Sequence, residues 1–352
     1  MKKIAIASAI TLASISAAHA MPTVYGKAVL GVDYINTDNE TASDTKQTLL
    51  QSHVSRIGFK GDEELTENTD LVYQLEYGIN IDDNSPQFNS RNTFLGLANR
   101  QYGTLLAGRH DTPFKLSKGS VAQFEDYKET DLGKVLSDEV RANNVLAYKS
   151  PAIVGYPVTF MAAVALSEND DSANKVLKPA VLNADGTVKT EAVTTSEAKQ
   201  KDNAYSASLA YDQNGVYVAG AYDSNVVDVD NAWRITGALD MGKMNLVQGL
   251  TLGAMYQNAN IYNKSEDEQS LVLSGKYKIG ETPWAIKAQY ATTENYKGVK
   301  DDKATEIALG GEYSFNKATK AHMYVAQINK DYKLGTKDED KTIVGTALEY
   351  KF

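Results

Sequence analysis

Residues 270–279 read Ser-Leu-Val-Leu-Ser-Gly-Lys-Tyr-Lys-Ile, and their side chains alternate in character along the chain. The odd positions, from Leu271 to Ile279, carry no charge and are mostly apolar, whereas serines and lysines hold most of the even positions. A period of two is typical of a β-strand with one apolar face and one wet face. The same alternation returns elsewhere in the chain, at 24–34, 71–80 and 306–315.

Segments of about 9 to 11 alternating residues are long enough to cross a bilayer as tilted strands. On that criterion the sequence predicts sixteen strands, an even number, as a closed antiparallel barrel with both chain ends on one side requires. We expect the strands near 23–35, 51–61, 69–81, 90–99, 103–112, 140–149, 157–168, 203–213, 216–224, 231–241, 249–259, 268–279, 284–294, 304–315, 320–331 and 341–352.

The predicted connections alternate in length, with tight turns at 99–102, 213–215, 280–283 and 316–319 and longer polar stretches at 36–50, 169–201 and 331–341. Short turns at one end and long loops at the other are typical of the periplasmic and extracellular ends of a transmembrane barrel. The 169–201 stretch has almost no aromatic residue, so we expect a mobile surface loop there. A barrel of this width is too wide for side chains to fill and encloses an aqueous channel.

Composition and charge exclude several other classes. The chain has 352 residues and a formal net charge of −9, which argues against a nucleic-acid-binding protein. It has no cysteine, and therefore no disulfide framework, thiolate metal site or cysteine nucleophile. Beyond residue 20 no run of 18 apolar residues occurs, so we expect no membrane-spanning helix.

Residues 1–20 have the three parts of a secretory signal peptide in order. Lys2 and Lys3 form a basic start, residues 4–17 an apolar stretch, and Ala18-His19-Ala20 a small-x-small cleavage site. We therefore expect export and cleavage after Ala20, with residues 21–352 forming an outer-membrane β-barrel domain.

The last predicted strand ends on an aromatic residue. Leu348, Tyr350 and Phe352 share one face of this strand, and Phe352 is the final residue of the chain. This ending resembles the signature that bacterial outer-membrane proteins present to the barrel assembly machinery, which identifies Phe352 as a candidate assembly signal.

Several sequence motifs of this chain resemble those of the general diffusion porins of Gram-negative bacteria. Val-Tyr-Gly-Lys-Ala at 24–28 is similar to the family's first strand, and Ser-Arg-Ile-Gly-Phe-Lys-Gly-Asp-Glu at 55–63 to its second strand and first turn. Three more blocks are similar to the strands that flank the family's third loop: Ser-Arg-Asn-Thr-Phe-Leu-Gly-Leu at 90–97, Tyr-Gly-Thr-Leu-Leu-Ala-Gly-Arg-His-Asp-Thr-Pro at 102–113, and Arg-Ala-Asn-Asn-Val-Leu-Ala-Tyr-Lys-Ser-Pro at 141–151. These blocks cover most of residues 23–151, and the remainder matches in architecture.

The resemblance implies a constriction inside the barrel. In the family the third loop folds inward, which here corresponds to about 111–140, and it faces a cluster of basic side chains on the opposite wall. Carried over position by position, the basic wall consists of Lys27, Arg56, Arg91 and Arg141, with Arg109 beside them by spacing. The loop carries Glu125, Asp126, Glu129 and Asp131. It lacks the family's Pro-Glu-Phe-Gly-Gly motif, so the sequence does not decide which of these carboxylates line the constriction.

The physics of the alternation supports part of this placement. Lys27 lies on the polar face of its strand, and Arg56 on the face opposite Ile57 and Phe59. Because a charge that faces lipid at mid-membrane costs roughly 2 to 4 kcal/mol, both should point into water. A basic wall facing carboxylates creates a transverse field that screens solutes by charge.

Two predicted strands alternate less regularly. If Arg91 points inward, simple alternation also places Leu95 and Leu97 inward. If Arg141 points inward, the same alternation places Asn144 outward. The family resemblance implies a homotrimer that packs near strands one to five and sixteen, and such packing explains the relaxed pattern. A shifted register is the alternative explanation.

Catalysis has little support in the sequence. His53, His110 and His322 lie on separate predicted strands, and the chain has no Gly-x-Ser-x-Gly elbow, no His-Glu-x-x-His helix and no phosphate-binding loop. His110, Asp111 and Ser117 include the residue types of a catalytic triad, but types alone are weak evidence. We expect no enzyme activity, no metal site and no cofactor.

The sequence therefore predicts a passive channel for ions and small hydrophilic solutes across the outer membrane, filtered by a charged constriction. Its expected partners are two further copies of the chain, lipopolysaccharide and outer-membrane lipid, the assembly machinery, and the permeating solutes. The acidic balance of the chain predicts a mild cation preference, moderated by the basic wall. Two alternatives remain: a substrate-specific outer-membrane channel, and a barrel without a pore that acts as an adhesin or structural anchor.

Overall fold

The computed structural model describes residues 21–39, 45–83, 87–153, 156–167, 202–333 and 338–352, together with the backbone of four short strands between 168 and 201. The predicted signal peptide and most of the predicted 169–201 loop lie outside the described residues. The four short strands pair with one another, β9 with β12 and β10 with β11; they are β9 (Lys175–Leu177), β10 (Val181–Leu182), β11 (Val188–Thr190) and β12 (Thr194–Ser196).

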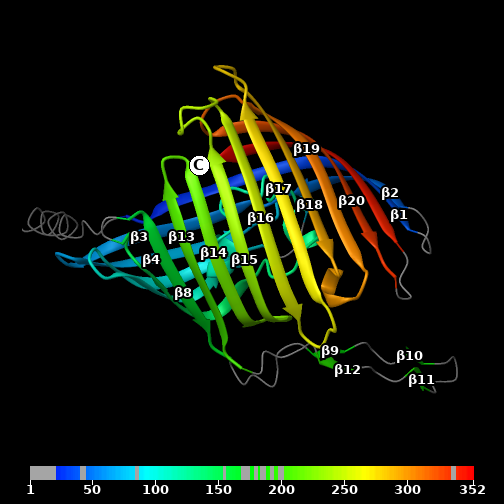
Figure 1. The fold of residues 1–352 in the computed structure, drawn as a ribbon, viewed down its shortest axis with the longest axis horizontal. Helices are drawn as coiled ribbons and strands as arrows, with labels where there is room; N and C mark the ends of the chain where they lie inside the picture. The colour runs from blue at the N-terminus through cyan, green and yellow to red at the C-terminus, as the bar shows by residue number, and fades with distance from the viewer. Residues whose placement is uncertain are drawn as a thin grey trace, which may run out of the picture.

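One large antiparallel sheet forms the body of the protein (Figure 1). Its strands are β1 (Thr23–Asn39), β2 (Thr45–Ser52), β3 (Arg56–Thr66), β4 (Thr69–Gly78), β5 (Asn89–Asn99), β6 (Gly103–Asp111), β7 (Arg141–Lys149), β8 (Val158–Ala165), β13 (Ala204–Gln213), β14 (Val216–Val226), β15 (Val229–Asp240), β16 (Leu250–Ile261), β17 (Asp267–Lys278), β18 (Trp284–Glu294), β19 (Lys303–Ser314), β20 (Thr319–Asp331) and β21 (Glu339–Lys351).

The sheet closes on itself because β1 pairs with the last strand, β21, from Lys27↔Lys351 to Asn39↔Glu339. Strands β2 and β3 both pair with β1 and follow each other as a single interrupted strand, so the wall is a closed barrel of sixteen strands. The predicted all-β, sixteen-stranded antiparallel barrel is thus confirmed.

Most strands begin and end close to the predicted positions, but the predicted loop at 36–50 is too long. Strand β1 continues to Asn39 and β2 begins at Thr45, and the two pair through Tyr34↔Thr48 and Asn36↔Lys46. Polar residues occur on both faces of this extension, so the alternation that marks the other strands is missing there. A strand with polar residues on both faces therefore resembles a loop in the sequence.

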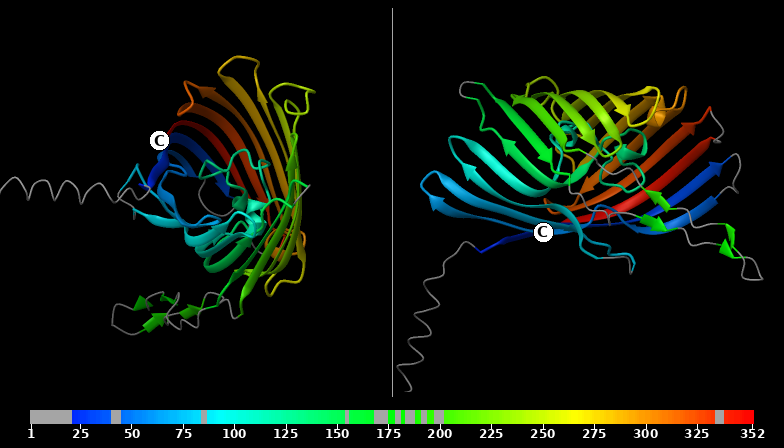
Figure 2. Two further views of the ribbon diagram at one scale, coloured as in Figure 1. Left: turned by 90° about the vertical axis from the view of Figure 1, so that its left-hand side faces the viewer. Right: turned by 90° about the horizontal axis from the view of Figure 1, so that it is seen from below.

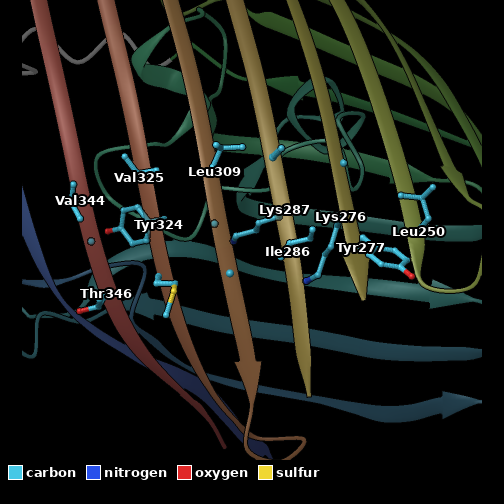
Figure 3. A pocket seen from close by; sticks show the side chains of 16 residues that line it. Leu250, Lys276, Tyr277, Ile286, Lys287, Leu309, Tyr324, Val325, Val344 and Thr346 are labelled. Atoms are coloured by element: carbon cyan, nitrogen blue, oxygen red, sulfur yellow. The ribbon is translucent and has the colours of Figure 1, made fainter. Parts of the chain in front are cut away.

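The outer surface is apolar, as the alternation predicts for a lipid-facing wall. Leu309 of β19 is 54% exposed and Val325 of β20 is 44% exposed, and both lie on the outer face (Figure 3). A shallow groove of about 820 Å³ runs there across β16 to β21. Within the described residues, no helix has the length and apolar composition that crossing a membrane requires.

Two β-bulges explain the irregular alternation near Arg91 and Arg141. Along β5 the register with β4 shifts between the pairs Leu75↔Thr93 and Tyr77↔Ser90, which inserts one extra residue. Along β7 a similar shift coincides with a positive φ of 53° at Asn144. A bulge turns the following side chains to the other face, so Leu95 and Leu97 face outward while Arg91 faces inward. The shifted register, one of the two expected explanations, is therefore the one that the structure shows.

The connection between β6 and β7 folds into the barrel and does not extend outward (Figure 2). This inward loop, residues 112–140, contains the short helix α2 (Pro113–Leu116) and a single 3-10 turn, η1 (Leu132–Lys134). Most of its large apolar side chains are buried against the inner wall; these are Phe114, Val121, Phe124, Tyr127, Leu132, Val135 and Leu136.

Candidate functional site

The inward loop packs against strands whose lumen-facing residues are small. The ring of Phe124 lies so close to Gly310 of β19 that a Cβ there would approach it to 3.0 Å, and a Cβ on Gly253 of β16 would meet Val121 at the same distance. Small wall residues thus leave room for the loop's large apolar side chains, whose burial is the main favourable term for holding the loop.

The tip of the loop is held by aromatic and polar contacts of Tyr127. Its ring stacks on that of Tyr324 of β20, and its hydroxyl accepts a hydrogen bond of 3.0 Å from Lys287 of β18. The next residue, Lys128, donates its backbone N–H to His53 in the gap between β2 and β3, at 3.3 Å. Contacts to β18, to β20 and to the gap between β2 and β3 therefore fix the position of the tip.

The base of the loop is held by Arg234 of β15, a fully buried arginine. Its guanidinium pairs with Glu139 at 2.7 Å, donates to Gln257 at 2.5 Å and lies 4.2 Å from the centre of the Phe114 ring. Such planar, multiply bonded contacts suit an arginine that is buried with a carboxylate. Nothing in the local sequence around 234 marks this role, because Glu139 lies 95 residues away in the chain.

The four acidic residues predicted in the loop have different partners. Asp126 accepts a hydrogen bond of 2.6 Å from Lys27 of β1, and Glu129 lies 3.4 Å from Lys341 of β21. Glu125 pairs with Lys118 of the loop itself at 2.9 Å. Asp131 accepts from the backbone N–H of Gly133 and caps η1. Two of the four thus contact the barrel wall, and the other two have their partners within the loop.

The loop's environment acts differently on two neighbouring carboxyls. Burial raises the pKa of Asp126, but the attraction of the Lys27 ammonium outweighs it, and the net shift is downward. At Glu125 burial dominates over the attraction of Lys118 and raises the pKa to about 7. Asp126 therefore remains charged at neutral pH, whereas Glu125 is partly protonated.

The predicted basic residues of β3, β5 and β7 share their carboxylates. Arg56 and Arg91 both pair with Glu76 of β4, at 3.6 and 2.7 Å. Arg141 pairs with Asp111 at 3.0 Å, and Lys115 of α2 lies 3.4 Å from the same carboxylate. Glu76 and Asp111 therefore each pair with two basic side chains. This part of the wall has more positive than negative charges as a result.

Two predicted members of the basic wall lie apart from that group. Lys27 is only 3% exposed and sits beneath the loop, between Asp126 and Glu349 of β21. Arg109 shares the strand face of Leu105 and Ala107, which line an apolar groove on the outside of the barrel. Its guanidinium donates to the backbone carbonyl of Ser90 at 3.1 Å and to the side chain of Asn143.

Sequence reasoning missed a second basic group, on the opposite side of the barrel. Lys276 of β17, Lys287 of β18 and Lys320 of β20 all lie within 3.5 Å of Glu312 of β19. The alternation already placed Lys276 on the polar face of its strand, and this was the available signal. What the sequence did not show is that three such lysines converge on one carboxylate.

The lumen beside the loop holds open space, lined by both polar and apolar side chains. A cavity of about 610 Å³ lies along the inner faces of β3 to β8, and its lining includes Lys60, Gln74, Asn92, His110 and Leu116. Charged and amide side chains border the space that the loop leaves free.

A family model described as Gram-negative porin matches residues 5–333. The chain belongs to the Gram-negative porin family. This porin is 27% identical to the major outer membrane protein P.IB of Neisseria gonorrhoeae over 394 residues, which cover all of both chains. It is also 27% identical to the major outer membrane protein P.IA of Neisseria meningitidis serogroup A over 278 residues, 77% of this chain and 65% of that protein.

Two solved structures have a similar fold. One is an anion-selective porin from Comamonas acidovorans, with a TM-score of 0.67 at 19% identity over 94% of this chain and 99% of that one. The other is OmpF of Salmonella typhi in complex with daunomycin, with a TM-score of 0.65 at 17% identity over 94% and 97% of the two chains.

The porin is therefore an outer-membrane diffusion channel, as the sequence predicts. Its homologues are channels, and members of the family are typically trimers that pass small solutes.

Proposed function

We propose that ions and small hydrophilic solutes cross this porin through the space between the inward loop and the wall of β3 to β7, and that Arg56, Arg91 and Arg141 are the basic side of the filter. The observation that carries the proposal is the position of the loop. Most of its large apolar side chains are buried against β14 to β21 and β1, so its opposite side borders the arginine-bearing wall. The side chains of Arg56 and Arg91 are 29% and 25% exposed and therefore reach water.

Asp126 is the predicted loop acid that best fits the facing side of the filter. Its side chain is half exposed, and Arg56 contributes to the lowering of its pKa. The field of the filter thus runs between Asp126 and the arginine wall, and a solute that passes between them loses part of its hydration while it gains interactions with fixed charges. We assign Glu125 and Asp131 to contacts within the loop, and Glu129 to its attachment to β21.

We further propose that the functional unit is a homotrimer that contacts its neighbours through the outer face of β1 to β6 and β21, the strands expected from the sequence. Arg109 supports this placement, because a guanidinium that faces lipid at mid-membrane costs roughly 2 to 4 kcal/mol, whereas a neighbouring protein subunit can supply hydrogen-bond acceptors. Outer-membrane lipid and lipopolysaccharide would cover the rest of the outer surface.

The position of Phe352 at the end of the strand that closes the barrel supports its proposed role as an assembly signal. Its backbone exchanges two hydrogen bonds with Gly26 of β1, of 3.0 and 3.1 Å, and its ring is half exposed beside Tyr350. An exposed terminal ring on the strand that closes the barrel is available for recognition by the assembly machinery before closure. Residues 1–20 would be removed during export, which sequencing of the mature N-terminus tests directly.

Single-insertion recordings in a planar lipid bilayer test the pore and its oligomeric state together. Purified, folded protein should produce long-lived conductance steps in concentrated salt that close in thirds. A folded protein that inserts without conductance would refute the diffusion pore and favour the adhesin or anchor alternative. Steps that close in a single event would refute the trimer of independent pores.

A further inference from the structure

Three lysines and one glutamate form a compact group on the lumen face of β17 to β20, which we call the lysine cradle. The Nζ atom of Lys276 lies 2.7 Å from Glu312, and those of Lys287 and Lys320 each lie 3.5 Å from it. Among the described residues, Glu312 is the only carboxylate within ion-pair distance of any of the three lysines. Three ammonium groups therefore share one carboxylate, and two positive charges are left without a partner.

The register of the strands makes this concentration of charge unusual. Lys276 lies directly opposite Lys287 on the adjacent strand, and the two are side by side in Figure 3. Like charges that face each other across a strand pair destabilise a sheet. One carboxylate reduces this repulsion but does not cancel it, and a bound anion would remove the remainder.

The three lysines are not equivalent in their contacts. Lys287 is buried, donates to the backbone carbonyl of Gln123 and the hydroxyl of Tyr127, and so supports the loop. The side chains of Lys276 and Lys320 are 32% and 28% exposed, and in the described part of the chain each has Glu312 as its sole hydrogen-bonded partner. Both retain donor capacity toward the lumen, since an ammonium group carries three N–H donors.

The position of the cradle along the barrel follows from the strand ends. Lys276 lies two residues before the end of β17 and Lys320 is the second residue of β20, so both lie near one rim of the barrel. Lys287, which touches the loop, is the member nearest the constriction. The cradle thus occupies the lumen between the inward loop and the turns at 279–283 and 315–318.

We propose that the lysine cradle is a binding site for multiply charged oxyanions of the phosphate class, on the rim side of the constriction. Lysine binds phosphate groups as a point charge, and two unpaired ammonium groups in a partly desolvated wall concentrate anions locally. The proposal rests on the proposed pore, because the anion reaches the cradle through the lumen. It also differs in sign from the mild cation preference expected from the net charge of the whole chain, since that count includes the acidic loops far from this wall.

Inorganic triphosphate is a suitable probe, applied to single channels in a bilayer at a fixed voltage. Wild-type channels should show concentration-dependent, brief interruptions of the current. The double variant Lys276→Gln/Lys320→Gln should raise the half-blocking concentration by about tenfold or more, equivalent to about 1.4 kcal/mol of binding free energy. Glu312→Gln should lower it, because the cradle then carries a third uncompensated charge. Block should weaken at high ionic strength.

Lys243→Gln is the matched control, because Lys243 lies in the connection after β15, is 70% exposed in its side chain and has the same charge. Its half-blocking concentration should equal that of the wild type. Normal conductance without block, or equal block of the wild type and the double variant, would overturn the cradle while leaving the pore intact. Absence of conductance from folded protein would instead overturn the pore itself, so the two failures are distinguishable.

Discussion

Tyr127 of the inward loop stacks on Tyr324 of β20, with ring centroids 4.1 Å apart and ring planes inclined by 19°. Tyr324 in turn donates a hydrogen bond of 2.5 Å to the buried carboxylate of Asp33 on β1. Through one pair of rings, the tip of the loop is thus connected to strands on both sides of β21. The position of the inward loop depends on this connection.

Replacing Tyr127 with alanine should loosen the tip of the loop. An aromatic pair contributes about 0.5 to 1.5 kcal/mol beyond the burial of its surface, and the variant loses both. We expect noisier single-channel current and a higher mean conductance than in the wild type. Tyr102→Ala, in an exposed turn, is the control and should leave both unchanged. If the current noise of the Tyr127→Ala variant equals that of the wild type, the other contacts hold the tip without the stacking of Tyr127 on Tyr324.

Replacing Arg234 with alanine should release the base of the loop. Removing one partner of a buried ion pair costs about 3 to 5 kcal/mol when the other charge stays buried without compensation. Glu139 keeps its pair with Lys118, so the loss here should lie near or below the lower end of that range. We expect trypsin to cleave within 112–140 much faster than in the wild type while the barrel remains folded. The control is Arg100→Ala, which removes an exposed arginine. Equal cleavage rates in the two variants would contradict the anchoring role.

Replacing Arg56 with alanine should change both the size and the charge of the filter. The variant leaves Glu76 with Arg91 alone and removes a long side chain from the wall. We expect a higher conductance and a shift of the reversal potential in a salt gradient toward cation selectivity. Arg100→Ala again serves as the control of equal charge. A variant with wild-type conductance and reversal potential would place Arg56 away from the constriction.

The raised pKa of Glu125 predicts a pH-dependent stability. A carboxyl whose pKa is raised by burial, here from 4.5 to about 7, binds its proton more tightly in the folded state than in the unfolded chain. The free energy of unfolding therefore falls as the pH rises through that window. Glu125→Gln cannot titrate, so it should match the wild type at pH 4 and exceed its stability at pH 8, by about 1 to 2 kcal/mol.

Thermal unfolding in detergent, followed by circular dichroism at the two pH values, measures this difference. Asp126→Asn is an informative comparison, because the pKa of Asp126 is lowered by Lys27 and its charged form stabilises the fold. That variant should lose stability at pH 8 and approach the wild type only at pH values below about 4. A Glu125→Gln variant that is less stable than the wild type at pH 8 would show that the ion pair with Lys118 outweighs burial.

The barrel could be predicted from the sequence because its main cause is local. Alternation between Leu271 and Lys276, or between Leu309 and Glu312, depends only on which face of a strand meets lipid. The prediction failed where that cause is absent, in the polar extension of β1 and β2. It was irregular around Arg91 and Asn144, because an inserted residue reverses the faces and periodicity alone does not show where the insertion lies.

The site was less accessible to sequence reasoning, since its contacts join distant parts of the chain. Lys27 and Asp126 are 99 residues apart, and Arg234 and Phe114 are 120 apart. Family resemblance covered the first 151 residues best, and so it suggested the arginines of β3 to β7. The lysines of β17 to β20 lie outside that part and became a group only when the strands were placed side by side.

The gap between β2 and β3 affects the attachment of the inward loop. At residues 53–55 the side chain of Ser55 both accepts from and donates to the backbone of Val29, in place of regular strand pairing. Ser55 is buried, so its hydroxyl is fixed by these two hydrogen bonds and joins the wall to β1 where the regular ladder is interrupted. The same interruption frees the ring of His53 to accept the backbone N–H of Lys128. A local break in the wall thus provides an attachment point for the tip of the inward loop.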